Sequence, residues 1–252
     1  ESDADAGATR RAAGHTTIRA DLHTYSPPPG LTVEGLWASP PCQALSAAGK
    51  REGVEDIARL EYVAARPEMW GIETVSTQGW NHPNSMLMIA ALRWVRDTRP
   101  QWVGFEQVPS ALPIWQAAGI GLRNLGYSSW TAVLNAADYG VPQTRRRAFL
   151  GARLGGVALP PEPTHARYPE PSLFGPELQP WVSMADALGW CGHVDQRSGG
   201  GDRPNGHADF TRRSSDEPAG TITSRSNRWL VDTHRDQQPD GTSQTVTTDR
   251  PA

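Results

Sequence analysis

The stretch Leu36-Trp37-Ala38-Ser39-Pro40-Pro41-Cys42-Gln43 decides the fold, because an apolar run ends there abruptly in two prolines. We expect residues 35–39 to form a short buried strand, since the prolines fix φ and stop further pairing. The residues after the strand have the small, polar composition of a loop, where chemistry often concentrates. The stretch therefore predicts a strand that delivers Cys42 into a loop. A buried structural cysteine is the alternative, because free Cys is among the most buried residue types.

Apolar strands alternate with helical patterns around this stretch. Helical periodicity and capping residues predict helices over residues 3–11, 53–65, 88–100 and 111–125. Short apolar or alternating runs predict strands over residues 16–21, 35–39, 102–106, 128–135 and 148–153. This rhythm predicts an α/β fold with a parallel sheet, in which ligands bind beyond the carboxyl ends of the strands. Asp21, Cys42 and Glu106 all fall at such ends.

Composition narrows the class of protein. The chain has 252 residues, of which 37% are hydrophobic and 20% charged, enough for one large domain or two small ones. The net charge of -3 argues against a polybasic protein but allows a local basic cleft. Cys42 and Cys191 are too few for a disulfide framework or a Cys-rich zinc site. No apolar run approaches the roughly 18 residues of a membrane span and no signal peptide is visible, so we expect a cytoplasmic protein. Since Cys191 and the histidines lack metal-ligand spacing, we expect no metal site.

The character of the chain changes after Arg153, where prolines break any regular element. We therefore expect two domains, a catalytic domain over residues 1–154 and a loop-rich region over residues 155–252. The second region has one helical pattern, over residues 182–190. Its candidate nucleic-acid contacts are Arg212, Arg213, Arg225, Arg228 and Trp229. Ordinary surface positions are the alternative for these side chains.

Three motifs occur in a fixed order: Pro-Pro-Cys-Gln at residues 40–43, Glu-Gln-Val-Pro at residues 106–109, and Gln-x-Arg-x-Arg at residues 143–147. In this order they resemble the DNA (cytosine-5)-methyltransferase family, and the resemblance spans most of the first 155 residues. It implies a Rossmann-like S-adenosylmethionine-dependent methyltransferase sheet, followed by a target-recognition region. It also implies an enzyme of a restriction-modification system, a phage or an orphan regulatory gene, acting as a monomer on double-stranded DNA.

The resemblance assigns the chemistry to four residues. Cys42 would add to carbon 6 of cytosine, because carbon 5 is not nucleophilic until such an addition. Glu106 would hold N3 and the exocyclic amine of the base. Arg145 and Arg147 would contact the base or a phosphate and favour the thiolate. The family has Asn where this chain has Gln107.

The resemblance also assigns binding residues. Those implied for the cofactor S-adenosylmethionine are Glu1 and Asp3 at the ribose, Asp21 and Leu22 near the adenine, and Pro41. Those implied for DNA, with the target cytosine flipped out of the duplex, are Gln43, Ser46, Lys50 and Gln143. A frayed, solvated terminus is the alternative for Glu1 and Asp3.

The family's opening Phe-x-Gly-x-Gly cofactor loop and its closing Gly-Asn-x-Val segment do not occur in this sequence. We therefore expect a fragment truncated at both ends, and its activity in isolation stays open. Two alternatives remain beside the DNA methyltransferase: an inactive DNA-binding remnant and an RNA cytosine-5 methyltransferase. Thymidylate synthase also adds a cysteine to carbon 6 of a pyrimidine, but the motifs at Glu106 and at residues 143–147 do not belong to it.

Overall fold

The structure is a computed structural model that describes most of the chain. The described residues are 2–41, 45, 55–71, 79–171, 175, 177–189, 195–198, 211–214, 216–220, 229–232 and 245–247. The chain divides into two compact units. Unit 1 comprises Glu1–Val133 and Arg147–Pro161, and unit 2 comprises Leu134–Arg146 and Glu162–Ala252.

The main sheet has four strands in the order β1-β2-β4-β3. The strands are β1 (Gly35–Ala38), β2 (Trp102–Gln107), β3 (Tyr127–Asn135) and β4 (Arg146–Leu154). β1 runs parallel to β2, with Trp37 opposite Gly104, whereas β4 runs antiparallel to β2, with Glu106 opposite Phe149. The structure therefore confirms the α/β, Rossmann-like class, but the prediction of an all-parallel sheet is wrong.

The antiparallel direction of β4 follows from its short connection to β3. Residues 136–145 hold only the 3-10 helix η5 (Ala136–Tyr139) and a turn. A parallel return would need a crossover of a dozen or more residues, usually a helix. The chain therefore turns back beside β3, and β4 lies between β2 and β3.

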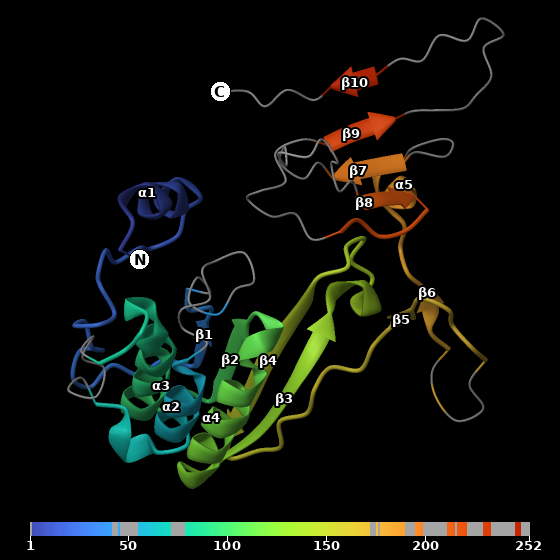
Figure 1. Cartoon of the computed structure of the whole chain (residues 1–252). Helices are drawn as coiled ribbons and strands as arrows, with labels where there is room; N and C mark the ends of the chain where they lie inside the picture. Colours follow the sequence, from blue (N-terminus) through green and yellow to red (C-terminus); the bar gives the residue numbers. More distant parts are fainter. Residues whose placement is uncertain are drawn as a thin grey trace, which may run out of the picture. The chain divides into compact units, whose positions relative to one another are not determined.

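Three helices lie side by side on one face of this sheet (Figure 1). They are α2 (Ile57–Ala64), α3 (Leu87–Thr98) and α4 (Leu112–Asn124), with the 3-10 helices η2 (Pro67–Met69), η3 (Pro83–Met86) and η4 (Pro109–Ala111). The alternate β2 residues Val103 and Phe105 are buried against them, and the ring of Phe105 lies 5.3 Å from that of Trp115. The helices predicted over residues 53–65, 88–100 and 111–125 are confirmed with shorter bounds.

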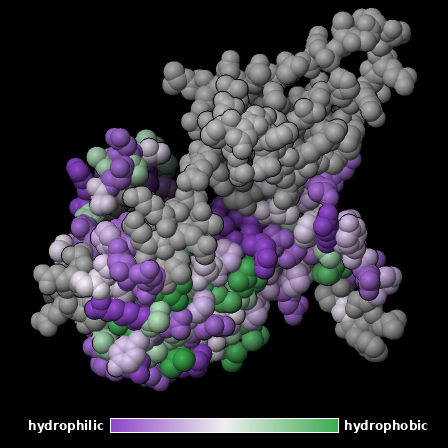
Figure 2. All heavy atoms as spheres, in the orientation of Figure 1, coloured by the Kyte–Doolittle hydropathy of each residue, from purple (hydrophilic) through white to green (hydrophobic). Residues whose placement is uncertain are grey.

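The opposite face of the sheet carries tryptophan rings over glycines. A Cβ atom on Gly104 would lie 2.4 Å from the ring of Trp37, and one on Gly151 would lie 2.5 Å from the ring of Trp130. Glycine in a strand interior often marks such a close approach. The Trp37 side chain is still 60% exposed. Elsewhere on the molecule, hydrophobic residues form separate patches among hydrophilic ones on the face that Figure 2 shows.

The N-terminal segment begins with α1 (Ala4–Ala12), as predicted over residues 3–11. Asp3 caps this helix, because its Oδ1 accepts a hydrogen bond of 2.7 Å from the backbone N–H of Ala6. The strand predicted over residues 16–21 is wrong, since those residues have no regular structure. A strand needs a neighbour, and among the described strands β1 pairs only with β2. Residues 16–21 therefore have no ladder to join.

Unit 2 contains a second, antiparallel sheet in the order β10-β9-β7-β8. Its strands are β7 (Asp195–Ser198), β8 (Thr211–Ser214), β9 (Trp229–Asp232) and β10 (Thr245–Thr247). The short strands β5 (His165–Ala166) and β6 (Gln179–Pro180) precede α5 (Met184–Leu188), which confirms the helix predicted over residues 182–190. The second sheet was not predicted. Throughout the described ranges of both units, no helix combines the length and the apolar character needed to cross a membrane.

Candidate functional site

Glu106 and Arg147 form an ion pair at one end of the main sheet. The Nε of Arg147 lies 3.0 Å from Oε1 of Glu106, and the two side chains are 19% and 20% exposed. Glu106 is opposite Phe149 in the antiparallel ladder, and Arg147 is two residues from Phe149, so both side chains project from one face. The sheet thus brings together two of the residues predicted to act on the base.

Gln107 joins this strand end to the segment that precedes Cys42. Its Nε2 donates a hydrogen bond of 2.8 Å to the carbonyl oxygen of Pro40, and its Oε1 accepts one of 2.7 Å from the backbone N–H of Val108. The side chain is only 2% exposed, so both bonds are shielded from water. The residue that departs from the family pattern therefore has a clear structural role.

Ser110, in η4, makes a second connection, from the segment after β2 to Leu45, three residues after Cys42. Its Oγ donates a hydrogen bond of 3.1 Å to the carbonyl oxygen of Leu45, whose side chain is 2% exposed and belongs to the hydrophobic core. Sequence reasoning missed both Gln107 and Ser110 as site residues. The available signal was their position in the sequence, one and four residues after Glu106.

Several predicted site residues lie outside the described residues. They are Glu1, Cys42, Gln43, Ser46 and Lys50. The structure therefore describes the residues before and after the predicted nucleophile, at Pro41 and Leu45.

Gln143 and Arg145 lie in unit 2, in the segment between β3 and β4. Gln143 forms an isolated parallel bridge with Ala219. Next to it, the backbone N–H of Thr144 donates to the carbonyl oxygen of Ala219 at 2.8 Å. The carbonyl oxygen of Arg145 accepts from the backbone N–H of Ala136 at 3.0 Å. Backbone hydrogen bonds therefore fix the conformation of the turn that carries both residues.

A cleft of about 430 Å³ lies in unit 1, beside the end of β1. Asp21, Leu22 and Pro41 all line it, as do Trp37 and Arg10. Three of the residues predicted at the cofactor therefore share one cleft, although Asp21 does not end a strand. Its volume falls in the range of small-molecule sites, about 300–1,000 Å³.

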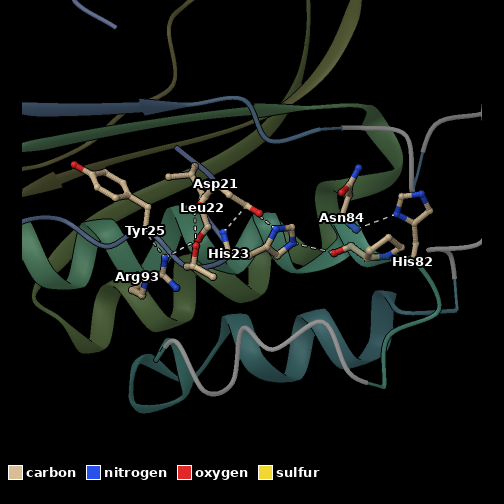
Figure 3. A network of polar contacts seen from close by, with 9 residues as sticks. Asp21, Leu22, His23, Tyr25, His82, Asn84 and Arg93 are labelled. Carbon is tan, nitrogen blue, oxygen red and sulfur yellow. Dashed lines mark hydrogen bonds and ion pairs between the residues drawn. The ribbon is translucent and has the colours of Figure 1, made fainter. Parts of the chain in front are cut away.

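The carboxylate of Asp21 is held by His23 (Figure 3). Its Oδ1 accepts a hydrogen bond of 2.9 Å from the backbone N–H of His23 and lies 2.8 Å from Nδ1 of the same residue. The backbone hydrogen bond, the ring hydrogen bond and the charge of His23 together outweigh burial and lower the pKa of Asp21 below its ordinary 3.8. Asp21 therefore presents a negative acceptor at the cleft.

Within the part of the chain that the structure describes, no group of three or more His, Cys, Asp or Glu side chains is placed to hold a metal ion.

Comparison with known proteins gives a family and several relatives. The family model of C-5 cytosine-specific DNA methylases matches residues 73–178, a range that contains Glu106, Gln143, Arg145 and Arg147. Type II methyltransferase M.AquIA from Picosynechococcus sp. is 31% identical over 175 residues, covering 63% of this chain and 60% of the relative. Type II methyltransferase M.AgeI from Thalassovita gelatinovora is 30% identical over 187 residues, covering 68% and 36%.

Among solved structures, a methyltransferase of Entamoeba histolytica, EhMeth, aligns with a TM-score of 0.42 and 18% identity. The alignment covers 62% of this chain and 44% of that one. This chain thus spans less than two thirds of the length of the proteins that it matches here.

Proposed function

Because this chain belongs to the C-5 cytosine-specific DNA methylase family, we propose that it transfers a methyl group from S-adenosylmethionine to carbon 5 of a cytosine in DNA. One observation carries the proposal. The hydrogen bond from Gln107 to Pro40 joins the strand end that bears Glu106 to the segment that leads into Cys42. This contact supports the proposal that Glu106, which would hold the cytosine, and Cys42, which would add to carbon 6, belong to one site.

Cys42 is the nucleophile in this proposal. Its thiolate forms a bond from Sγ to carbon 6 as the π bond between carbons 5 and 6 breaks, and carbon 5 becomes nucleophilic. A free thiol has a pKa of about 8.5, so only a few per cent is thiolate at neutral pH. Once carbon 5 carries the transferred methyl group, its proton is lost to solvent and Cys42 departs as the thiolate, so that the bond between carbons 5 and 6 becomes double again.

Glu106 and Arg147 control charge on the cytosine ring. Addition at carbon 6 is easier when N3 is protonated or strongly hydrogen-bonded, and Glu106 is proposed to hold N3–H and the exocyclic amine. The ion pair with Arg147 orients the carboxylate, because the guanidinium fixes one of its two oxygens at 3.0 Å.

The cleft beside β1 fits the adenosine part of S-adenosylmethionine. The Asp21 carboxylate is an acceptor suited to the amino group of adenine, and Leu22 and Pro41 offer apolar contacts to a flat ring. When bound, the cofactor supplies an electrophilic methyl group on a sulfonium centre. Glu1 and Asp3 are proposed for the ribose hydroxyls, with Asp3 also capping α1.

The proposed substrate is double-stranded DNA with the target cytosine flipped out, since a stacked base is out of reach of Cys42. Gln43, Ser46, Lys50 and Gln143 are proposed as contacts to the strand. Arg145 adds positive charge from the same motif as Arg147 and is proposed to contact the base carbonyl or a phosphate.

The test is covalent trapping on DNA that contains 5-fluorocytosine. With S-adenosylmethionine present, the fluorine at carbon 5 blocks the final elimination, so the wild-type chain should form a stable adduct that migrates slowly on a denaturing gel. Cys42→Ser should abolish the adduct, while Cys191→Ser should retain it. An adduct that survives Cys42→Ser would contradict the proposed nucleophile.

A further inference from the structure

We propose that Arg93 and His23 are positioning residues for the cofactor, acting through the turn at residues 21–25, which we call the cofactor turn. The inference rests on the proposed function, in which S-adenosylmethionine occupies the cleft lined by Asp21 and Leu22. Neither Arg93 nor His23 lines that cleft. Both instead fix the backbone and the side chain that do.

The cofactor turn has no strand to support it. Residues 15–21 lack regular structure, and the turn closes on itself through bonds of 3.1 and 2.8 Å from the N–H groups of Thr24 and Tyr25 to the carbonyl oxygen of Asp21. Such a turn sets its own shape but not its place against the sheet. That place must come from contacts with other elements.

Arg93 supplies the contact with α3. Its side chain is 1% exposed, and its Nη2 donates hydrogen bonds of 2.7 and 2.9 Å to the carbonyl oxygens of Leu22 and Tyr25. The Nε and Nη1 atoms are buried and find no hydrogen-bond partner among the described residues. Burying a guanidinium costs free energy unless hydrogen bonds offset the loss of water, and an apolar side chain would fill this position of α3 at lower cost. In this structure, the hydrogen bonds of Arg93 hold both ends of the segment from Leu22 to Tyr25.

His23 supplies the contact with η3. Its Nδ1 lies 2.8 Å from Oδ1 of Asp21 and its Nε2 lies 3.1 Å from the carbonyl oxygen of Pro83. Both ring nitrogens thus lie within hydrogen-bond distance of an oxygen atom, one on the cofactor turn and one at the start of η3. The His23 side chain is 16% exposed, whereas that of Asp21 is 58% exposed and open to the cleft. The contacts of His23 with Oδ1 therefore fix the orientation of the Asp21 carboxylate at the cleft.

The two residues together tie the cofactor turn to two elements (Figure 3). Arg93 holds its backbone against α3, and His23 holds the Asp21 carboxylate against the start of η3. The ring of Tyr25 also packs against that of Trp94 on α3, with centroids 5.8 Å apart. If either Arg93 or His23 is replaced, the Asp21 carboxylate and the Leu22 side chain should be held less firmly in the positions from which they would contact adenine.

The experiment measures binding of S-adenosylhomocysteine by calorimetry, together with kcat and KM for S-adenosylmethionine and for DNA. Arg93→Met keeps the bulk and removes the donors, and we expect about tenfold weaker binding, the scale of one lost hydrogen bond to a charged group. KM for S-adenosylmethionine should rise by a similar factor, with kcat and KM for DNA nearly unchanged. Arg93→Lys retains a charged donor and should recover part of the affinity.

The matched control is Arg96→Gln, one turn along the same helix, where the side chain is 31% exposed and pairs with Asp97. It should bind S-adenosylhomocysteine like wild type. His23→Gln tests the second anchor and should weaken binding severalfold while the thermal unfolding midpoint stays close to that of wild type. If Arg93→Met does not fold, His23→Gln decides the question, because the His23 side chain is less buried than that of Arg93 and its replacement leaves the hydrogen bonds of Arg93 in place.

The outcomes separate the two proposals. A wild-type chain that binds no S-adenosylhomocysteine overturns the proposed function and the positioning role that rests on it. Wild-type binding with unchanged affinity in folded His23→Gln and Arg93→Met overturns only the positioning role. A rise in KM for DNA that equals the rise for S-adenosylmethionine also overturns it, since general loosening of the fold would then explain both.

Discussion

Arg147 on β4 holds Glu106 on β2 through an ion pair of 3.0 Å, and both side chains are about four-fifths buried. Their strands are neighbours in an antiparallel ladder, so the register of the sheet sets the distance between them. Because the pair is shielded on most sides, its attraction is screened less than that of a surface salt bridge. The orientation of the Glu106 carboxylate, the proposed acid, is therefore set in part by the register of β2 and β4.

The first prediction is that Glu106 and Arg147 act as a unit in methyl transfer. Glu106→Gln should slow single-turnover methyl transfer by about 100-fold or more, the scale of a lost acid or base, while DNA binding remains. Arg147→Ala should slow it as well, because the carboxylate loses its orientation. The double variant should be little worse than Glu106→Gln alone.

Arg153→Ala is the matched control, since Arg153 is an exposed residue on the same strand. It should leave single-turnover rates near those of wild type. Strictly additive effects of Glu106→Gln and Arg147→Ala would show that the two side chains act separately.

The second prediction concerns Gln107, which bonds to the carbonyl oxygen of Pro40. Gln107→Glu keeps the acceptor for Val108 but removes the donor and sets a carboxylate against a carbonyl oxygen. We expect a loss of about 1–3 kcal/mol in the free energy of unfolding, the cost of an unsatisfied buried group. Urea denaturation measures this loss, and kcat should fall because the segment before Cys42 loses its anchor.

Gln101→Glu, at an exposed position just before β2, is the control for added negative charge. It should change neither the unfolding free energy nor kcat appreciably. Wild-type kcat in Gln107→Glu would argue that the Pro40 bond is irrelevant to the reaction.

Local sequence signals predicted most of unit 1. The apolar spacing of Met88, Ile89, Leu92 and Val95 predicted α3, and all four side chains are buried. Gly126 predicted the end of α4 and adopts φ 85° just after it. These features depend on residues close together in the chain, so they can be predicted from a single sequence.

Features set by distant residues were not predictable in the same way. The direction of β4 depends on how the short connection from β3 folds back. Residues 16–21 have the composition of a strand but form none, because they have no neighbouring strand with which to pair. The pairing of Glu106 with Arg147 spans two strands, and the bond from Gln107 to Pro40 joins residues 67 apart. The buried anchor Arg93 has the sequence context of a solvated helix face.

The third prediction is that substitution by alanine clearly lowers the stability of the protein at one glycine of α4 and changes it little at another. A Cβ atom on Gly121 in α4 would lie 2.6 Å from both the carbonyl oxygen of Ala64 and the ring of Trp70. Gly121→Ala should therefore destabilise the protein by about 1–3 kcal/mol despite the better helix propensity of alanine, because α2 and α4 must separate. Thermal or urea unfolding measures the change.

Gly119→Ala on the same helix is the control, since its Cβ would meet only the side chains of Ser129 and Arg123, at 3.2 and 3.4 Å. Its effect on stability should be small. Equal losses at Gly119 and Gly121 would contradict close packing of α2 against α4 as the cause.

The fourth prediction concerns Asp56, a carboxylate that is 2% exposed and accepts four hydrogen bonds just before α2. Its Oδ1 accepts from the backbone and side-chain nitrogens of Asn81, both at 3.0 Å. Its Oδ2 accepts from the backbone N–H of His82 at 3.1 Å and from Oγ of Ser85 at 2.7 Å. Asp56→Asn replaces one acceptor oxygen by a donor, so it should lower the free energy of unfolding at pH 7 by about 1–3 kcal/mol.

The pH dependence of that loss identifies the ionised carboxylate as its source. Burial raises the pKa of Asp56, but the hydrogen bonds from Asn81, Ser85 and His82 together outweigh burial and hold the pKa below its ordinary 3.8. A lowered pKa in the folded state stabilises the fold above pH 3.8, and this stabilisation disappears as the pH falls through the lower, folded-state value. The difference in unfolding free energy between wild type and Asp56→Asn should therefore be constant near neutral pH and shrink below about pH 4, whereas Glu55→Gln, at an exposed neighbour, should show no such trend. A difference that stays constant into acid would mean that the shape of the side chain, and not its charge, holds the segment at residues 81–85.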